Sequence, residues 1–276
     1  MRFLAATLFW LLATVALVVT LPTAWSQANL VDTNGYLRLA GRAAAQPALQ
    51  DAVAAELSAQ AVRLIREQGY DVDASRVRSA AAEYTAGPSF PLQFERVNRD
   101  GHAWLFSGRD TGPWVIDVVP MLSDAAFAQL LADYHVALPA SMTVPLTPTS
   151  NELMRPGQLH RIAVWGPWVS GGLAVLTGCC ALLTFVVARH RGRALASLGV
   201  SALLVGAAGW SGIEVARRRL DGVLAQATGD IRRIADVIAD LAEASLHHWL
   251  NLTLAAGTAL VLFGVAVALV GGLRKK

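Results

Sequence analysis

The feature that most constrains the fold of this chain is a stretch without a charged side chain that runs from residue 162 to residue 188. The hydrocarbon core of a bilayer is about 30 Å thick and is crossed by roughly 20 apolar residues in a helix. The stretch is therefore long enough to cross a membrane with some tilt. It stops at a basic cluster formed by Arg189, Arg191 and Arg193, and short basic loops tend to stay in the cytoplasm. The cytoplasmic position of this basic cluster predicts on which side of the membrane every other segment lies.

The composition agrees with a membrane class. Only 16% of the 276 residues are charged and 54% are hydrophobic, whereas soluble domains contain about 25% charged residues. The net charge of +3 does not indicate nucleic-acid binding, because the basic excess lies at the ends of apolar runs and forms no phosphate-binding face. The region 22–160 is in fact acidic, with ten Arg against fourteen Asp and Glu.

The sequence predicts a mainly α-helical membrane protein with four transmembrane helices. The predicted spans are residues 1–21, 162–188, 194–213 and 249–273. The segments between and after them are an extracytoplasmic domain at 22–161, a cytoplasmic loop at 189–193, an extracytoplasmic segment at 214–248 and a cytoplasmic tail at 274–276.

The first span has two interpretations. The tripeptide Ser26-Gln27-Ala28 resembles a cleavage site, which favours a secretory signal. The charge-free run at 3–20 is longer than the roughly 7–15 residues of a signal's apolar region, which favours an uncleaved anchor. We prefer the anchor and expect Pro22 to close its helix. Both interpretations send the following residues out of the cytoplasm.

Basic residues predict that both termini of this plasma (inner) membrane protein lie in the cytoplasm. The chain start, the loop 189–193 and the tail 274–276 all carry basic side chains and would lie on one side. The arginine triplet at 217–219 opposes this orientation, because it would lie outside. Its acidic neighbours Glu214 and Asp221 partly offset that charge.

The extracytoplasmic domain is predicted to be mostly helical with a small two-stranded β element. Helices are expected after Asp32, from Gln46 to Gly69, at 75–84, at 90–106 and from Asp124 to about residue 134. The second helix has apolar residues at helical spacing, namely Leu49, Val53, Leu57, Ala61, Leu64 and Ile65. Strand composition occurs at 114–119 and at 142–146, where a proline restricts the strand to an edge.

The segment 214–248 carries an apolar stripe at alternating spacings of four and three. The stripe consists of Leu220, Leu224, Ala227, Ile231, Ile234, Ile238, Leu241 and Ser245. It predicts an amphipathic helix, or two helices with a break at Thr228-Gly229. The stripe has three possible partners: the large outer domain, which we favour, the outer leaflet of the membrane, or a second copy in a dimer.

The fourth span has a small-residue face, formed by Gly257, Gly264 and Gly271. Small residues let helix backbones approach closely in lipid. We interpret this face as a helix-packing surface, with a dimerisation motif as the alternative.

The candidate polar site is a stripe formed by Glu95, Asn98 and His102, which share one face of the predicted helix at 90–106. A general acid–base pair needs such proximity, but an ordinary buried hydrogen-bond network has the same pattern. We favour structural bonding, with ligand binding next and catalysis last. The sequence contains no nucleophile elbow, phosphate loop or zinc-ligand spacing. We therefore predict no catalytic residue, no metal and no cofactor.

Several short motifs resemble those of a family of uncharacterised four-span integral membrane proteins of actinobacteria. The first is Phe90-x-x-x-Phe94-x-x-Val97-Asn98-x-x-x-His102, in which that family commonly has Trp in place of Phe94. The others are Val31-Asp32-Thr33-Asn34-Gly35-Tyr36, Pro47-Ala48-Leu49-Gln50-Asp51-Ala52-Val53 and Glu214-Val215-Ala216-Arg217-Arg218-Arg219-Leu220. The resemblance implies the same topology and a cell-envelope location. It implies no functional residue, because the family has no assigned activity.

The leading functional hypothesis is a non-enzymatic protein of the bacterial cell envelope whose outer domain binds a partner protein or lipid. The first alternative is a lipid- or peptide-handling enzyme that uses the polar stripe. The second is a small transporter or channel subunit, which is weakened because the apolar runs contain no Asp, Glu, Lys or Arg. The sequence indicates no nucleic-acid partner and does not determine the oligomeric state.

Overall fold

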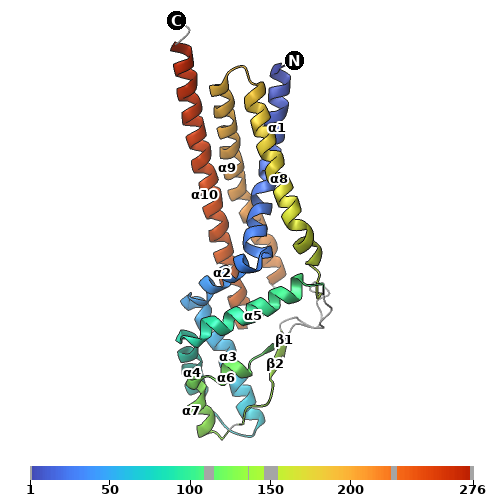
Figure 1. The fold of residues 1–276 in the computed structure, drawn as a ribbon. Coiled ribbons are helices and arrows are strands. Elements are labelled where there is room, and N and C mark those ends of the chain that lie inside the picture. Colours follow the sequence, from blue (N-terminus) through green and yellow to red (C-terminus); the bar gives the residue numbers. More distant parts are fainter. Residues whose placement is uncertain (1, 109–114, 136, 146–154, 225–228, 274–276) are drawn as a thin grey trace. The chain divides into compact units, whose positions relative to one another are not determined.

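The computed structural model of the chain describes residues 2–108, 115–135, 137–145, 155–224 and 229–273. Most of these residues are helical, as predicted (Figure 1). The chain divides into two compact units. We call them the bundle unit, which consists of Met1–Leu30, Val164–Asp221 and Glu243–Lys276, and the globular unit, which consists of Val31–Ala163 and Gly222–Ala242.

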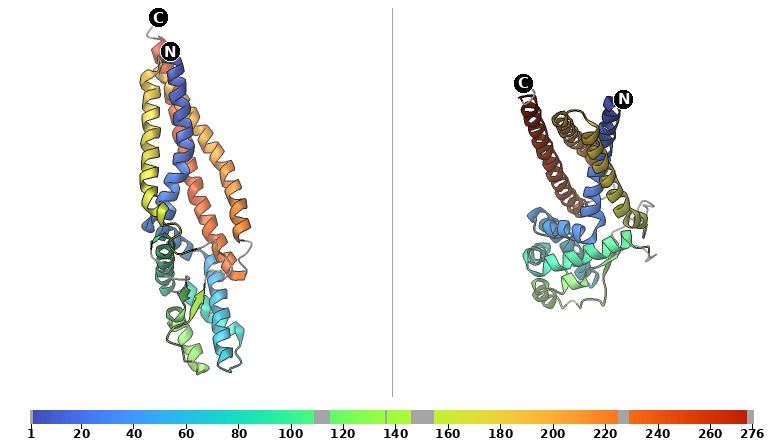
Figure 2. Two further views of the ribbon diagram at one scale, coloured as in Figure 1. Left: turned by 90° about the vertical axis from the view of Figure 1, so that its right-hand side faces the viewer. Right: turned by 45° about the horizontal axis from the view of Figure 1, so that its top comes forward.

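Long helices supply the bundle unit. They are α1 (Arg2–Ser26), α8 (His160–Val187), α9 (Arg191–Leu224) and α10 (Gly229–Leu273). All four are long and apolar enough to cross a membrane, which confirms the four predicted spans at the level of helix length and composition. The start of α1, the connection between α8 and α9 and the end of α10 lie at the same end of this unit (Figures 1 and 2).

The first helix does not close at Pro22, which corrects the sequence-based expectation. α1 continues to Ser26 and is followed by a π-helical turn at Gln27–Val31. Proline removes one backbone hydrogen bond from a helix interior, and hydroxyl side chains help to satisfy such a turn in an apolar helix. Here Thr23 donates its hydroxyl to the carbonyl of Val19 at 2.7 Å.

The third and fourth apolar helices are longer than the predicted spans. α9 begins at Arg191, inside the stretch predicted as a loop, and continues to Leu224. The predicted amphipathic segment at 214–248 is divided: its first part lies in α9, and α10 joins the part from Gly229 onward to the fourth span in one helix. α10 begins at Gly229, next to the predicted break, where a φ of +65° is readily adopted by glycine.

Polar side chains connect α1 with each of the other three bundle helices. The hydrogen bonds join the hydroxyls of Thr20 and Thr177 at 2.9 Å, the hydroxyls of Thr14 and Ser201 at 2.7 Å, and Trp25 Nε1 to Ser245 Oγ at 3.3 Å. Such bonds each stabilise helix association in lipid by about 0.6–2 kcal/mol. They supply specificity to a unit whose outer faces are apolar.

Shorter helices build the globular unit. They are α2 (Thr33–Ala44), α3 (Pro47–Glu67), α4 (Ala74–Ala86), α5 (Ser89–Phe106), α6 (Val119–Leu122) and α7 (Ala125–Asp133). The predicted starts at Asp32, Gln46 and Asp124 are confirmed. The side chain of Asp32 accepts the backbone N–H of Gly35 at 2.8 Å, which satisfies one of the free donors at a helix start.

The core of the globular unit includes the residues of α3 that the helical periodicity selected. All six predicted apolar positions of α3 are buried. Tyr84, Phe90 and Phe127 meet in the same core, with the ring of Tyr84 edge-on to Phe90 at 5.8 Å between centroids. Aromatic pairs of this geometry add to the stabilisation from burial alone.

The two strands are short and pair antiparallel. β1 (Val115–Asp117) lies beside β2 (Thr143–Pro145), with Ile116 opposite Val144. The strand predicted at 114–119 is shorter than expected, because α6 already begins at Val119. The backbone bond from Val118 N to Met142 O at 2.9 Å places Pro145 at a non-hydrogen-bonded position. Its missing N–H therefore costs no bond between the strands.

The first part of α10 belongs to the globular unit. Ile234, Val237, Ile238 and Leu241 pack against the core of that unit. This confirms, for the predicted stripe residues Ile234, Ile238 and Leu241, packing on the large domain over the two alternatives. Ala227 of the stripe lies outside the described residues.

Candidate functional site

The predicted polar stripe divides into a buried part and a surface part. Asn98 and His102 are 8% and 5% exposed. Glu95 is 39% exposed and forms an ion pair with Arg99, one turn further along α5, at 2.7 Å. The three residues thus lie on one helix face, as predicted, but they do not face a common cleft.

Asn98 connects α5 with α2. Its side-chain oxygen accepts the hydroxyl of Tyr36 at 2.8 Å, and its amide nitrogen donates to the carbonyl of Phe94 at 2.9 Å. Burial raises the pKa of the Tyr36 hydroxyl, so this hydroxyl stays protonated and remains a donor. The Asn98 side chain therefore acts as a hydrogen-bonded link between two helices.

His102 is held between aromatic rings. Its imidazole stacks on Phe106 with 4.4 Å between ring centroids and lies 5.0 Å from the ring of Tyr36. A catalytic pair must reach a substrate, and this closed setting does not provide that access. The geometry favours structural bonding over chemistry at Asn98 and His102.

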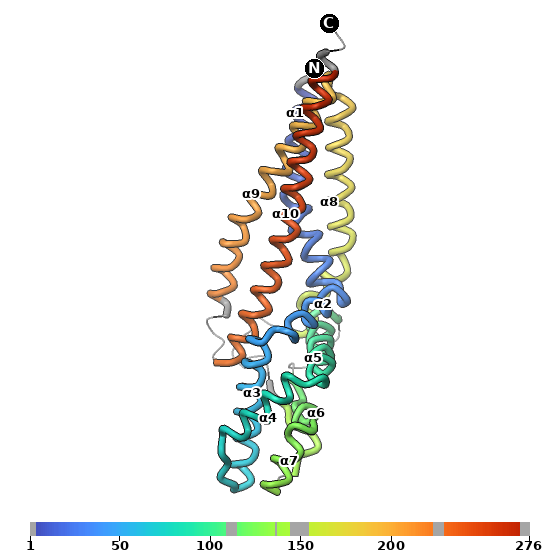
Figure 3. The backbone as a smooth tube through the Cα atoms, turned by 90° about the vertical axis from the view of Figure 1, so that its left-hand side faces the viewer, coloured from blue at the N-terminus to red at the C-terminus, as the bar shows by residue number. Residues whose placement is uncertain are grey.

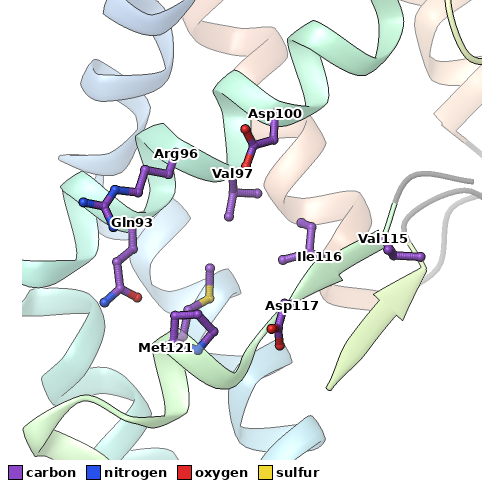
Figure 4. Close-up of a pocket in the computed structure, with 9 residues that line it drawn as sticks. Gln93, Arg96, Val97, Asp100, Val115, Ile116, Asp117 and Met121 are labelled. Carbon is purple, nitrogen blue, oxygen red and sulfur yellow. The ribbon is translucent and has the colours of Figure 1, made fainter. Parts of the chain in front are cut away.

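A surface cavity lies on another side of α5. It has a volume of about 250 Å³ and is bounded by α5, β1 and the start of α6. Its lining residues are Gln93, Arg96, Val97, Asp100, Val115, Ile116, Asp117, Pro120 and Met121 (Figure 4). This cavity, which we call the α5–β1 cavity, is the candidate binding site of the globular unit.

The α5–β1 cavity combines an apolar middle with charged ends. Figure 4 shows Arg96 directed away from Asp100, while Val97 and Met121 lie between the groups on the two sides. Two hydrogen bonds fix the side chain of Asp117. Its Oδ1 accepts the backbone N–H groups of Val119 at 3.1 Å and Met142 at 3.0 Å. A fixed carboxylate of this kind suits recognition of a cation, since little ordering is left to occur on binding.

None of the patterns in the sequence described above predicts this cavity. Its residues on α5 follow the spacing 93, 96, 97 and 100, which marks one helix face. That spacing is the one pattern in the sequence that could have indicated the α5 wall of the cavity. The other wall comes from β1 and α6, and their packing against α5 is a tertiary feature without a local sequence pattern.

The predicted glycine face of the fourth span packs within the chain. α9 and α10 run antiparallel (Figure 3). A Cβ atom on Gly264 would lie 2.6 Å from the carbonyl oxygen of Gly192, and one on Gly257 would lie 2.9 Å from that of Gly199. Only glycine permits such an approach of two backbones. Gly271 lies within α10, but the surroundings of this position are outside the described part of the structure.

The remaining candidate chemistry is sparse. Cys179 and Cys180 are free thiols on α8, and neighbouring positions of a helix do not form a disulfide with each other. Among the residues that the structure describes, no three His, Cys, Asp or Glu side chains gather into a metal-binding group.

Comparisons of the chain with models of protein families, with curated proteins and with solved structures find no match. The resemblance to an actinobacterial membrane-protein family therefore stays a prediction. We infer the function from the geometry of the chain alone.

Proposed function

We propose that the chain is a non-enzymatic integral membrane protein of a bacterial plasma (inner) membrane that crosses the bilayer four times and binds a partner protein through its extracytoplasmic globular unit. One observation carries the proposal: a set of apolar helices is joined in one chain to a unit that has its own buried core and a charged surface cavity.

The exposed surface of the bundle unit supports the membrane location. Among the described residues, every exposed large apolar side chain lies on α1, α8, α9 or α10, except Tyr70, Leu92 and Val115. Water-facing surfaces rarely expose continuous apolar area on this scale. In a lipid bilayer, these apolar side chains would be removed from water, and the free-energy cost of exposing them would disappear.

The ends of the helices support cytoplasmic termini. The start of α1 and the α8–α9 connection, which carries Arg189 and Arg191, lie at one end of the bundle unit (Figures 1 and 2). The basic groups that determine orientation thus gather at one face of the membrane, which is the cytoplasmic face by the positive-inside tendency.

Ion pairs neutralise part of the positive charge of the arginine triplet at 217–219, which by itself would oppose the proposed orientation. Arg217 pairs with Glu243 on α10 at 2.6 Å, and Arg218 pairs with Glu214 at 3.0 Å. Two of the three positive charges therefore have an acidic partner on the same unit, which weakens their effect on orientation.

The size of the α5–β1 cavity supports a protein partner over a small-molecule substrate. Ligand pockets for small molecules usually measure about 300–1,000 Å³, and this one is smaller and open at the surface. Protein interfaces commonly seat a single anchor side chain in a pocket of this kind.

Topology is tested with reporters fused after residue 130, in the globular unit, and after residue 190, between α8 and α9. A phosphatase that is active only outside the cytoplasm is expected to work at the first site and to be silent at the second. Activity at both sites, or silence at both, would overturn the four-span orientation.

Partner binding is tested by photo-crosslinking in native membranes. A crosslinking residue at Leu92, which is 65% exposed on the globular unit, is compared with one at Leu262, which is 66% exposed on α10. We expect protein adducts from the first position and lipid adducts from the second. Lipid adducts alone at Leu92 and at other exposed positions of the globular unit would replace the protein partner by a lipid.

A further inference from the structure

We propose that the α5–β1 cavity binds a short extended segment of the partner polypeptide that presents an acidic, an apolar and a basic side chain on one face. This inference rests on the proposed function, because it names the site on the globular unit and the chemistry of the partner segment that it takes.

The two ends of the cavity carry opposite hydrogen-bonding character. At one end, Arg96 supplies a guanidinium, and the oxygen of Gln93 accepts the hydroxyl of Tyr84 at 2.8 Å, so its NH₂ group is the part that can donate to a ligand. At the other end, Asp100 and Asp117 supply carboxylates, which only accept when ionised. An acidic group fits the first end and a basic group fits the second.

The middle of the cavity is apolar. Val97 and Met121 line it between the charged ends (Figure 4), and Met121 is 7% exposed. Methionine adapts its shape to different apolar partners. An aliphatic side chain of the bound segment would cover this surface and remove apolar area from water.

The strand beside the cavity offers backbone hydrogen bonds. The alternation of the β1–β2 pair turns the N–H and C=O groups of Val115 and Asp117 away from β2. These groups make no backbone hydrogen bond to another residue in the described ranges. An extended peptide can add to such an edge, with its side chains on one face entering pockets beside it.

The length of the cavity wall on α5 favours a polypeptide over a zwitterionic lipid headgroup. Gln93 and Asp100 are seven residues apart on α5, which corresponds to about 10 Å along a helix. Three alternate residues of an extended segment cover about 13 Å, so their side chains reach both ends. The phosphate and ammonium of a headgroup are joined by a two-carbon linker, which is too short to engage both.

The test uses the full-length protein in lipid nanodiscs and three short peptides with alternating threonines. One peptide carries Glu, Ile and Lys at every second position, one carries Glu, Ile and Glu, and one carries Lys, Ile and Lys. Affinity is measured by fluorescence anisotropy. We expect the unmodified protein to prefer the mixed peptide over either like-charged peptide by about fivefold, the ratio that corresponds to one exposed charge pair.

Charge reversal inside the cavity then switches the preference. Arg96→Glu makes both ends acidic and is expected to favour the Lys-Ile-Lys peptide, whereas Asp100→Lys is expected to favour the Glu-Ile-Glu peptide. Arg99→Glu is the matched control, because it makes the same change of net charge on the same helix but does not line the cavity. Arg96 and Asp100 are exposed, so these variants are expected to fold, which a thermal melt verifies.

The outcomes separate the inference from the function on which it rests. An equal shift with Arg96→Glu and Arg99→Glu would assign the effect to overall charge and overturn the site. No binding of any peptide, together with protein adducts at Leu92, would also overturn the site but leave the proposed function intact. Displacement of the mixed peptide by phosphatidylethanolamine vesicles from the unmodified protein and from Arg99→Glu, but not from Arg96→Glu, would assign the cavity to lipid instead.

Discussion

The two units of this chain place their large apolar side chains in opposite ways. In the globular unit Phe90 is 0% exposed, whereas Phe263 on α10 of the bundle unit is 61% exposed. Burial of apolar area drives folding in water, but it gives no advantage between helices in lipid, since lipid tails are as apolar as the side chains. Under the proposed membrane location, one chain follows two sets of packing rules, and the exposure of aromatic side chains distinguishes the two units.

The contacts between helices differ in the same way. In the globular unit, bulky side chains such as Tyr84 and Phe127 fill the space between helices. In the bundle unit, Gly192 and Gly199 of α9 approach Gly264 and Gly257 of α10 with nothing between the backbones. Close packing of small residues and interhelical hydrogen bonds are the interactions that hold helices together in lipid, which agrees with the proposed membrane location of the bundle unit.

The same substitution at Phe90 and Phe263 gives the largest expected contrast. Phe90→Ala removes a fully buried ring and is expected to destabilise the globular unit by about 3–5 kcal/mol. Phe263→Ala is expected to change stability by less than about 0.5 kcal/mol, as surface substitutions usually do. Pulse proteolysis of the full chain in guanidinium measures both. Similar losses for the two variants would contradict the assignment of Phe263 to a lipid-facing surface.

A second contrast uses two glycines of apolar helices. Gly264→Ala would place a Cβ 2.5 Å from Ala196 N, and we expect overpacking to cost about 1–3 kcal/mol. Gly178→Ala, on α8, has no atom within 4 Å of the new Cβ and is expected to be neutral or to stabilise by up to about 1 kcal/mol through helix propensity. Unfolding in mixed micelles, followed by circular dichroism, measures the difference. Equal effects would show that α9 and α10 are not in close contact.

Alkaline pH is expected to affect the globular unit through Tyr84. Burial, and secondarily the charge of Asp124, raise the pKa of this tyrosine above its ordinary value of 10.0. The folded state thus holds the phenolic proton more tightly than the unfolded state, so the stability that depends on it is complete below pH 10 and falls as the pH rises toward the folded-state pKa. Tyr84→Phe is expected to lose about 1 kcal/mol at neutral pH with its hydrogen bond to Gln93.

When the pH is raised from 7 to above 10, the free energy of unfolding of Tyr84→Phe is expected to fall by less than that of the unmodified protein. Guanidinium midpoints at pH 7 and above pH 10 supply the measurement. The pKa of Tyr36 is also raised by burial, so part of the alkaline loss persists in the variant. Identical pH profiles for the two proteins would indicate that Tyr84 ionises normally.

Local patterns in the sequence were sufficient for the helices and much of the core. Asp32 and Asp124 mark helix starts by a mechanism that acts within three residues. The buried positions of α3 repeat with the helical period, and the charge-free run at 162–188 forms a helix that is long and apolar enough to cross a membrane. These features depend on neighbours in sequence, and they were predicted correctly.

Features that depend on distant residues were missed. The α5–β1 cavity forms only where α5, which carries Arg96, lies beside β1, which carries Asp117, and the two elements are distant in sequence. The division of the predicted stripe follows from the burial of Asn98 against Tyr36 on α2, which left Glu95 at the surface. The continuation of α1 through Pro22 goes against the local rule that proline ends a helix, and no pattern around Pro22 marks the exception.

The smallest expected effect compares two ion pairs at the end of α9. The Arg217–Glu243 pair joins α9 to α10, and its side chains are 32% and 30% exposed, whereas those of Arg218 and Glu214, one turn apart on α9, are 76% and 64% exposed. Because water screens the second pair more strongly, double-mutant cycles to alanine are expected to give a coupling of about 0.5–1 kcal/mol for the first pair and below about 0.5 kcal/mol for the second. Arg217 also lies 3.9 Å from Asp221, which retains part of its stabilisation when Glu243 is removed and keeps the first coupling modest. A larger coupling for Arg218–Glu214 would mean that the charges on α9 act mainly along their own helix. The pairing between α9 and α10 would then depend on uncharged contacts, such as Gly264 with Gly192 and Leu250 with Ile213.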